Sequence, residues 1–201
     1  MGNLRVIWKH EVRQADKIAR SLLETRRAKV GWKIFVLPFL LYDYISFRKT
    51  LIPTRKNILF TKRLAFNAAT EILRGKERAL EIRLIEIDTR KILDKERKGY
   101  YTEKVRRKQL HEIELLLDHY LDLANSNGTT YEDMVKLTYQ SEKGYLSFLS
   151  KLHQTERDVI HAAVTTMRRG SKRGRESWFA TLDKAIRQVR QEEVERIFLE
   201  A

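Results

Sequence analysis

The chain has 201 residues and a formal net charge of +14 at pH 7, and 42% of its residues are hydrophobic. That length and apolar content are sufficient for one domain with a buried core. Because the sequence contains no cysteine, disulfides, thiolate zinc sites, iron–sulfur clusters and cysteine nucleophiles are excluded. Eight glycines and two prolines are too few for the many turns of a β-sandwich or β-barrel, so the composition favours an all-α protein.

Apolar residues spaced three and four apart predict an irregular bundle of five to seven helices, with one short apolar, proline-containing helical segment near the N-terminus. In chain order, the predicted helices cover residues 4–29, 56–97, 102–124, 129–139, 141–167 and 178–199. The second is predicted as one long helix that stops at Gly99, and Thr129 with Glu132 has the spacing of a capping box. Residues 168–177 are predicted to form a basic loop.

The positive charge is concentrated near the N-terminus. Residues 26–63 contain ten basic side chains and one acid, Asp43, so they carry +9 of the net +14. We therefore divide the chain into residues 1–63, which hold the first helix and a basic-flanked apolar segment, and residues 64–201, which form a helical bundle. We expect one domain in which the N-terminal helix packs on the rest.

The apolar run 34–47 is too short to cross a bilayer as a straight helix. It would rise about 21 Å, whereas the hydrocarbon core of a membrane is about 30 Å thick. No small-residue cleavage pattern follows it, which argues against a secretory signal. Its aromatic rings suit headgroup depth, and Pro38 can bend a helix that dips into one leaflet. The predicted membrane-contact residues are Trp32, Ile34, Phe35, Leu37, Pro38, Phe39, Leu40, Tyr42, Tyr44 and Phe47.

Basic residues on both sides of this run predict contact with an anionic membrane face. Each Lys or Arg close to such a surface contributes about 1 kcal/mol to binding. The predicted anion-binding residues are Lys33, Arg48, Lys49, Arg55, Lys56, Arg168, Arg169, Lys172, Arg173 and Arg175. Two other interpretations of the run stay open, a buried core helix and a protein-docking surface, because a helix that is apolar all round also occurs at the centre of a soluble bundle.

The sequence contains no catalytic or cofactor motif that we recognise. Carboxylate-bridged metal sites in helix bundles need two pairs of the Glu-x-x-His kind, and Asp158 with His161 is the single pair of this polarity. Residues 170–175 lack the Gly-Lys-Ser/Thr ending of a phosphate-binding loop. We therefore expect no metal and no cofactor.

The resulting hypothesis is a non-enzymatic, peripheral or monotopic membrane-associated protein, located in the cytoplasm at the inner face of a membrane and serving as an adaptor or scaffold. The alternative is a soluble nucleic-acid-binding or regulatory helical protein, because nucleic acid is the usual partner of a chain with a pI near 10. An enzyme that acts on a lipid or a phosphorylated substrate is the third hypothesis. A protein partner is compatible with the first, and the sequence does not indicate an oligomeric state.

Overall fold

The computed structural model describes residues 2–28, 58–95, 101–166 and 172–199, and every regular element in these ranges is a helix. The predicted all-α class and irregular bundle are thereby confirmed. The helices are α1 (Gly2–Ala28), a helix over residues 58–73, α3 (Arg78–Lys95), α4 (Glu103–Asn125), α5 (Tyr131–Tyr139), α6 (Glu142–Thr166) and α7 (Lys172–Phe198). The helices predicted at 102–124, 129–139 and 141–167 agree with α4, α5 and α6 to within two residues at each end.

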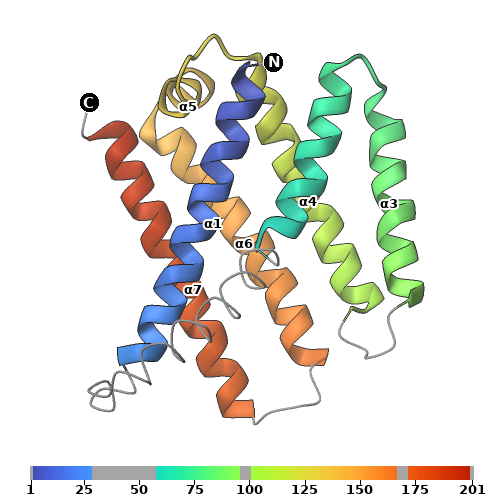
Figure 1. The fold of residues 1–201 in the computed structure, drawn as a ribbon, viewed down its shortest axis with the longest axis vertical. Coiled ribbons are helices and arrows are strands. Elements are labelled where there is room, and N and C mark those ends of the chain that lie inside the picture. Colours follow the sequence, from blue (N-terminus) through green and yellow to red (C-terminus); the bar gives the residue numbers. More distant parts are fainter. Residues whose placement is uncertain (1, 29–57, 96–100, 167–171, 200–201) are drawn as a thin grey trace, which may run out of the picture.

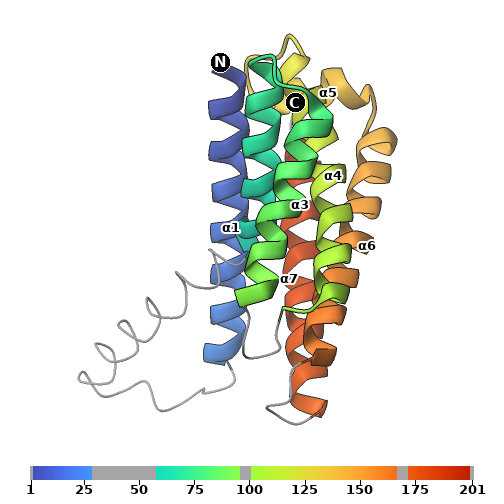
Figure 2. The ribbon, with the colours of Figure 1, turned by 90° about the vertical axis from the view of Figure 1, so that its right-hand side faces the viewer.

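The long helices run up and down along one common axis, and the short α5 lies at the end where both chain termini are found (Figure 1). Four of them form a ring, because α4 packs on α6, α6 on α7, α7 on α1 and α1 on α4. The 58–73 helix lies beside α1 and α4, where the ring of Phe66 contacts Trp8 and Tyr120. Figure 2 shows the same bundle from the side of α3, which packs against α4 at one edge.

The apolar stripe predicted for the first helix faces the core. Ile7, Ala15 and Ile18 of α1 are buried, and Leu116 and Tyr120 of α4 are fully buried opposite this region. Each fully buried large side chain contributes about 1.5–3 kcal/mol to folding. Residue 63, the predicted end of the N-terminal part, lies inside the 58–73 helix.

The prediction of one long helix over 56–97 is wrong, because the chain reverses at Gly75. Its φ is +97°, a backbone conformation that favours glycine. The N–H of Gly75 donates to the carbonyl of Ile72 at 2.9 Å, and the N–H of Lys76 donates to that of Glu71 at 3.1 Å. These two bonds form a Schellman motif, which ends the 58–73 helix and allows α3 to fold back as a helical hairpin.

Gly75→Ala is expected to lower the free energy of unfolding by about 1 kcal/mol. An added Cβ would have nothing within 4 Å, so the cost arises only from placing an L-residue at positive φ. Gly2→Ala is the matched control, since its Cβ would also be in open space and no positive φ is recorded there. Denaturant unfolding of the two variants measures the difference, and equal stability would contradict the role assigned to Gly75.

Two other local predictions need correction. The capping box of α5 is formed by Thr130 and Asp133 rather than by the Thr129–Glu132 pair. The basic segment predicted as a loop over 168–177 is helical from Lys172 onward. Lys, Arg and Glu are good helix formers, and the single Gly174 costs only about 1 kcal/mol relative to Ala, which the packing of a long helix offsets.

Candidate functional site

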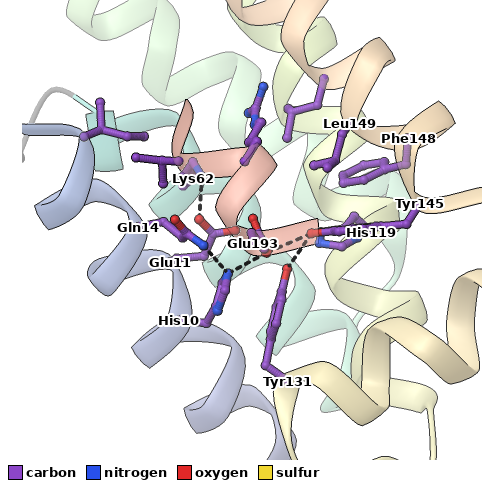
Figure 3. Close-up of a pocket in the computed structure, with 14 residues that line it drawn as sticks. His10, Glu11, Gln14, Lys62, His119, Tyr131, Tyr145, Phe148, Leu149 and Glu193 are labelled. Carbon is purple, nitrogen blue, oxygen red and sulfur yellow. Dashed lines mark hydrogen bonds and ion pairs between the residues drawn. The ribbon is translucent and has the colours of Figure 1, made fainter. Parts of the chain in front are cut away.

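Polar side chains occupy core positions on the helices that surround the centre of the bundle. Nine residues of α4 are buried: Val105, Gln109, Glu112, Ile113, Leu116, Leu117, His119, Tyr120 and Leu123. Three of the nine, Gln109, Glu112 and His119, are polar. Glu11 and Gln14 likewise continue the buried stripe of α1, and Glu193 continues that of α7. Packing of the ring therefore brings ionisable groups from distant parts of the sequence into one buried cluster (Figure 3).

The first pair of this cluster joins α1 to the 58–73 helix. Lys62 Nζ lies 2.5 Å from Glu11 Oε2, and the hydroxyl of Tyr120 donates to Glu11 Oε1 at 2.9 Å. Burial acts to raise the pKa of Glu11, but the charge and hydrogen bond of Lys62 and the nearby His10 lower it to about 2. Burial acts to lower the pKa of Lys62, but the charges of Glu11 and Glu156 hold it above its ordinary value. Both groups are therefore charged at neutral pH.

The second buried carboxylate is Glu193 of α7. The hydroxyl of Tyr145 donates to its Oε1 at 2.9 Å, and His10 Nε2 lies 2.9 Å from the same oxygen. The imidazole of His10 stacks on the ring of Tyr131 with 3.5 Å between centroids. Burial acts to raise the pKa of Glu193, but the hydrogen bonds and charge of its partners keep it below its usual range. These contacts tie α1, α5, α6 and α7 together.

A third group of charges joins α6 to α7. Arg190 Nη2 lies 2.7 Å from Glu156 Oε1, and His153 Nε2 lies 3.0 Å from Asp183 Oδ1. Burial acts to lower the pKa of Arg190, but the charge of Glu156 and its hydrogen bond raise it above its ordinary value. Burial and the charge of Arg190 lower the pKa of His153. The guanidinium therefore stays charged opposite a carboxylate.

Two members of the cluster are uncharged at neutral pH. Burial, together with the charge of Glu156, raises the pKa of Glu112 to about 8. Burial lowers the pKa of His119 to about 4, and its Nδ1 lies 2.7 Å from the hydroxyl of Tyr139 while its ring stacks on Phe148. The cluster thus combines paired charges with neutral groups, which is how ionisable side chains are tolerated away from water.

The cavity at the centre of this cluster is small. Its volume is about 30 Å³, and His10, Glu11, Lys62, Tyr145 and Glu193 are among the residues that line it. Such a volume holds a single water molecule, whereas pockets for small-molecule substrates measure about 300–1,000 Å³. Perturbed pKa values often mark catalytic sites, but this cluster has no room for a substrate. Its geometry is that of a polar network that fixes how the helices pack.

A larger hollow of about 480 Å³ opens near the N-terminal end of α1, with Leu4, Phe66 and Leu73 among the residues that line it. Its charged side chain, Arg74, is paired with Glu71 at 2.6 Å. No group of three or more side chains suited to a metal occurs within the described part of the chain. Within the same part, no helix is both long and apolar enough to cross a bilayer.

Most of the residues predicted from sequence to contact a membrane or an anion lie outside the described ranges. These are the ten predicted membrane-contact residues and Lys33, Arg48, Lys49, Arg55, Lys56, Arg168 and Arg169. Lys172, Arg173 and Arg175 fall in the first turn of α7, where Arg173 is exposed. Lys62, counted in the charge excess of residues 26–63, is buried against Glu11, so that charge is neutralised inside the bundle.

One end of the bundle carries several basic side chains, of which Arg106 and Arg107 lie near Glu103 and Lys108 lies 2.8 Å from Asp158. The end of α1, the start of α4 and the start of α7 all lie at this end of the bundle, opposite the end that carries both termini (Figures 1 and 2). Lys104, Arg106, Arg107 and Lys108 lie with Glu103 within the first six residues of α4, whereas its second half carries Glu114, Asp118 and Asp122 and no Lys or Arg. We call residues 104–108 and 172–175 the basic end.

No family model, no curated protein and no solved structure matches this chain. The class of this protein is therefore assigned from the geometry of the described residues alone. It is an all-α bundle with a paired, buried ionisable cluster and a basic end.

Proposed function

We propose that the protein is a non-enzymatic scaffold or adaptor that binds peripherally to an anionic membrane through residues 32–56 and the basic end. One observation carries this proposal. The last turn of α1, after which the sequence continues into the basic-flanked apolar run, lies at the same end of the bundle where α4 and α7 begin with basic residues. An apolar segment and a positively charged surface at one end of a protein are the two signals that stable peripheral anchoring needs.

Basic and apolar side chains are both expected to contribute to the free energy of membrane binding. Each basic side chain near an anionic leaflet contributes about 1 kcal/mol, and each apolar side chain that enters the interface adds about 1.5–3 kcal/mol when fully buried. The amino ends of α4 and α7 add partial positive charge, because their first N–H groups point toward that end. The central cavity, about 30 Å³, is too small for a substrate, and in the hollow of about 480 Å³ the charged lining residue, Arg74, is paired with Glu71. Both observations support a binding role over an enzymatic one.

Neutralising the basic end is expected to weaken binding to anionic vesicles by about 100-fold at low salt, since three charges at about 1 kcal/mol each are removed. The variant is Lys104→Gln/Arg107→Gln/Arg173→Gln, at three exposed positions. Its matched control, Arg5→Gln/Lys9→Gln/Lys143→Gln, removes three exposed charges near the opposite end and is expected to bind as the wild type does. Co-sedimentation with phosphatidylcholine vesicles, with and without phosphatidylglycerol, measures both.

Replacing Phe35, Leu37, Phe39 and Leu40 with Ser tests the apolar component in the same assay. The proposal expects loss of vesicle binding with the thermal unfolding transition retained. It would be overturned if the wild-type protein ignored anionic vesicles, or if the two charge variants bound equally. Salt-dependent retention of the wild type by duplex DNA, with no binding to vesicles, would support the nucleic-acid alternative instead.

A further inference from the structure

The helix α3 has a buried face and, apart from it, a line of apolar side chains that has no partner among the described residues. Ile85 and Thr89 are buried on the face that packs against α4. On another face, Leu80, Leu84 and Ile87 are 48%, 43% and 43% exposed. Their spacing of four and then three residues places them in one line along the helix, which we call the α3 stripe. Large apolar side chains aligned on an edge helix are typical of an interaction surface.

The charges beside the α3 stripe have a definite order. With Leu80 and Ile87 at d positions and Leu84 at an a position of a heptad, Arg83 and Arg90 fall at g and Asp88 falls at e. One flank of the stripe is therefore basic, with Arg90 paired to Glu103 of α4 at 2.9 Å, and the other flank carries the exposed acid Asp88. This order makes the stripe complementary to itself in one orientation only.

We propose that the α3 stripe packs against the α3 stripe of a second copy of the chain, with the two helices parallel. In a parallel pair, a g residue faces the e residue five positions later on the other helix, so Arg83 of each copy faces Asp88 of the other. In an antiparallel pair, g positions face g positions, and Arg83 would lie near Arg90 of the other copy. The charges thus favour the parallel arrangement and oppose the antiparallel one.

The proposed pairing is weak and depends on concentration. Three apolar side chains per copy supply far less than the roughly 800 Å² per partner of a standard stable interface. Lys91 occupies the next a position of the stripe, and a lysine there lowers stability while it restricts register and orientation. Asp88 lies 3.0 Å from Lys91 within its own helix, but both side chains are more than 60% exposed, so this contact can rearrange at little cost.

A parallel pair has a consequence for membrane binding, which rests on the proposed function. Because α3 runs along the bundle axis, a twofold axis parallel to α3 points the basic ends of both copies in the same direction (Figures 1 and 2). Two basic ends on one surface bind more tightly than one, since the second contact becomes intramolecular. Dimerisation itself requires no lipid, so it can be tested independently.

Sedimentation velocity of the full chain without lipid, from low to several hundred micromolar, tests the pairing. The wild type is expected to shift from monomer toward dimer, and Leu84→Gln/Ile87→Gln is expected to raise the dissociation constant at least tenfold. Leu137→Gln, at a 54% exposed leucine of α5, is the control and should dimerise as the wild type does. A monomeric wild type at all concentrations, or equal effects of the two variants, would overturn the proposal.

A charge exchange tests the orientation. Arg83→Asp and Asp88→Arg are each expected to weaken the dimer at least tenfold, and the double variant should restore it, because the reversed pair forms again between parallel helices. Failure of the double variant to restore dimerisation would overturn the parallel arrangement. If the stripe variant lost vesicle binding while the wild type stayed monomeric, the stripe would be a membrane contact rather than a dimer interface.

Discussion

Lys62→Met is expected to lower the free energy of unfolding by about 3–5 kcal/mol, because it leaves the carboxylate of Glu11 buried without its counter-charge. In the wild type, Lys62 Nζ lies 2.5 Å from Glu11 Oε2 and both side chains are less than a tenth exposed. The hydroxyl of Tyr120 can donate one hydrogen bond to Glu11 but cannot neutralise it. Urea denaturation of wild type and variant at pH 7.5 measures the difference.

Two further variants show whether the ion pair itself causes this loss. Glu11→Gln/Lys62→Met removes both charges and is expected to recover about 1–3 kcal/mol relative to Lys62→Met, the usual size of coupling between contacting residues. Lys17→Met removes an exposed lysine 3.6 Å from Glu192 and is expected to cost less than about 1 kcal/mol. If Lys62→Met were as stable as Lys17→Met, the prediction would be wrong, and the buried ion pair would add nothing to the stability that packing supplies.

The helices that sequence predicts best are those whose inward positions are mainly apolar. Ile7, Ala15 and Ile18 mark the buried face of α1 without ambiguity. The sequence pattern does not predict the reversal at Gly75, because the Arg, Lys and Glu residues around it favour a helix. A single glycine among such residues can either continue a helix or cap its carboxyl end. The local hydrogen bonds that decide between them depend on the packing of α3 back onto α4.

The buried ionisable cluster could not be assigned from sequence, because its partners are far apart in the chain. Glu11 and Lys62 are separated by 51 residues, and each by itself resembles an ordinary solvated charge on a helix. The sequence of α4 nevertheless contains one indication of buried polar groups. Gln109, Glu112 and His119 keep the three-and-four spacing of the core positions of α4 but place polar side chains in its apolar stripe. Polar residues in an otherwise apolar stripe indicate buried polar contacts when several helices show the same interruption.

Glu112 makes the stability of the protein fall as the pH rises above neutrality. Its pKa is raised to about 8 in the folded chain, so the folded state holds a proton that the unfolded state releases near pH 4.5. A carboxyl group shifted in this direction stabilises the fold fully below pH 4.5, and this contribution is lost as the pH rises toward 8. His119 has the opposite effect, because its pKa is lowered to about 4 and its contribution is lost as the pH falls from 6.5 to 4.

Between pH 4.5 and 6.5 the stability lost through Glu112 and the stability gained through His119 nearly cancel. Above pH 6.5 only the loss through Glu112 continues. Between pH 6.5 and 8.5 we expect the free energy of unfolding of the wild type to fall by about 1–2 kcal/mol, given about 1.4 kcal/mol for each unit of pKa difference. Glu112→Gln keeps the shape of the protonated acid and cannot ionise, so its stability should stay level across this window. The exposed Glu114→Gln serves as the control and should retain the slope of the wild type. Chemical denaturation at closely spaced pH values measures all three, and an unchanged slope in Glu112→Gln would mean that another group in the cluster releases the proton.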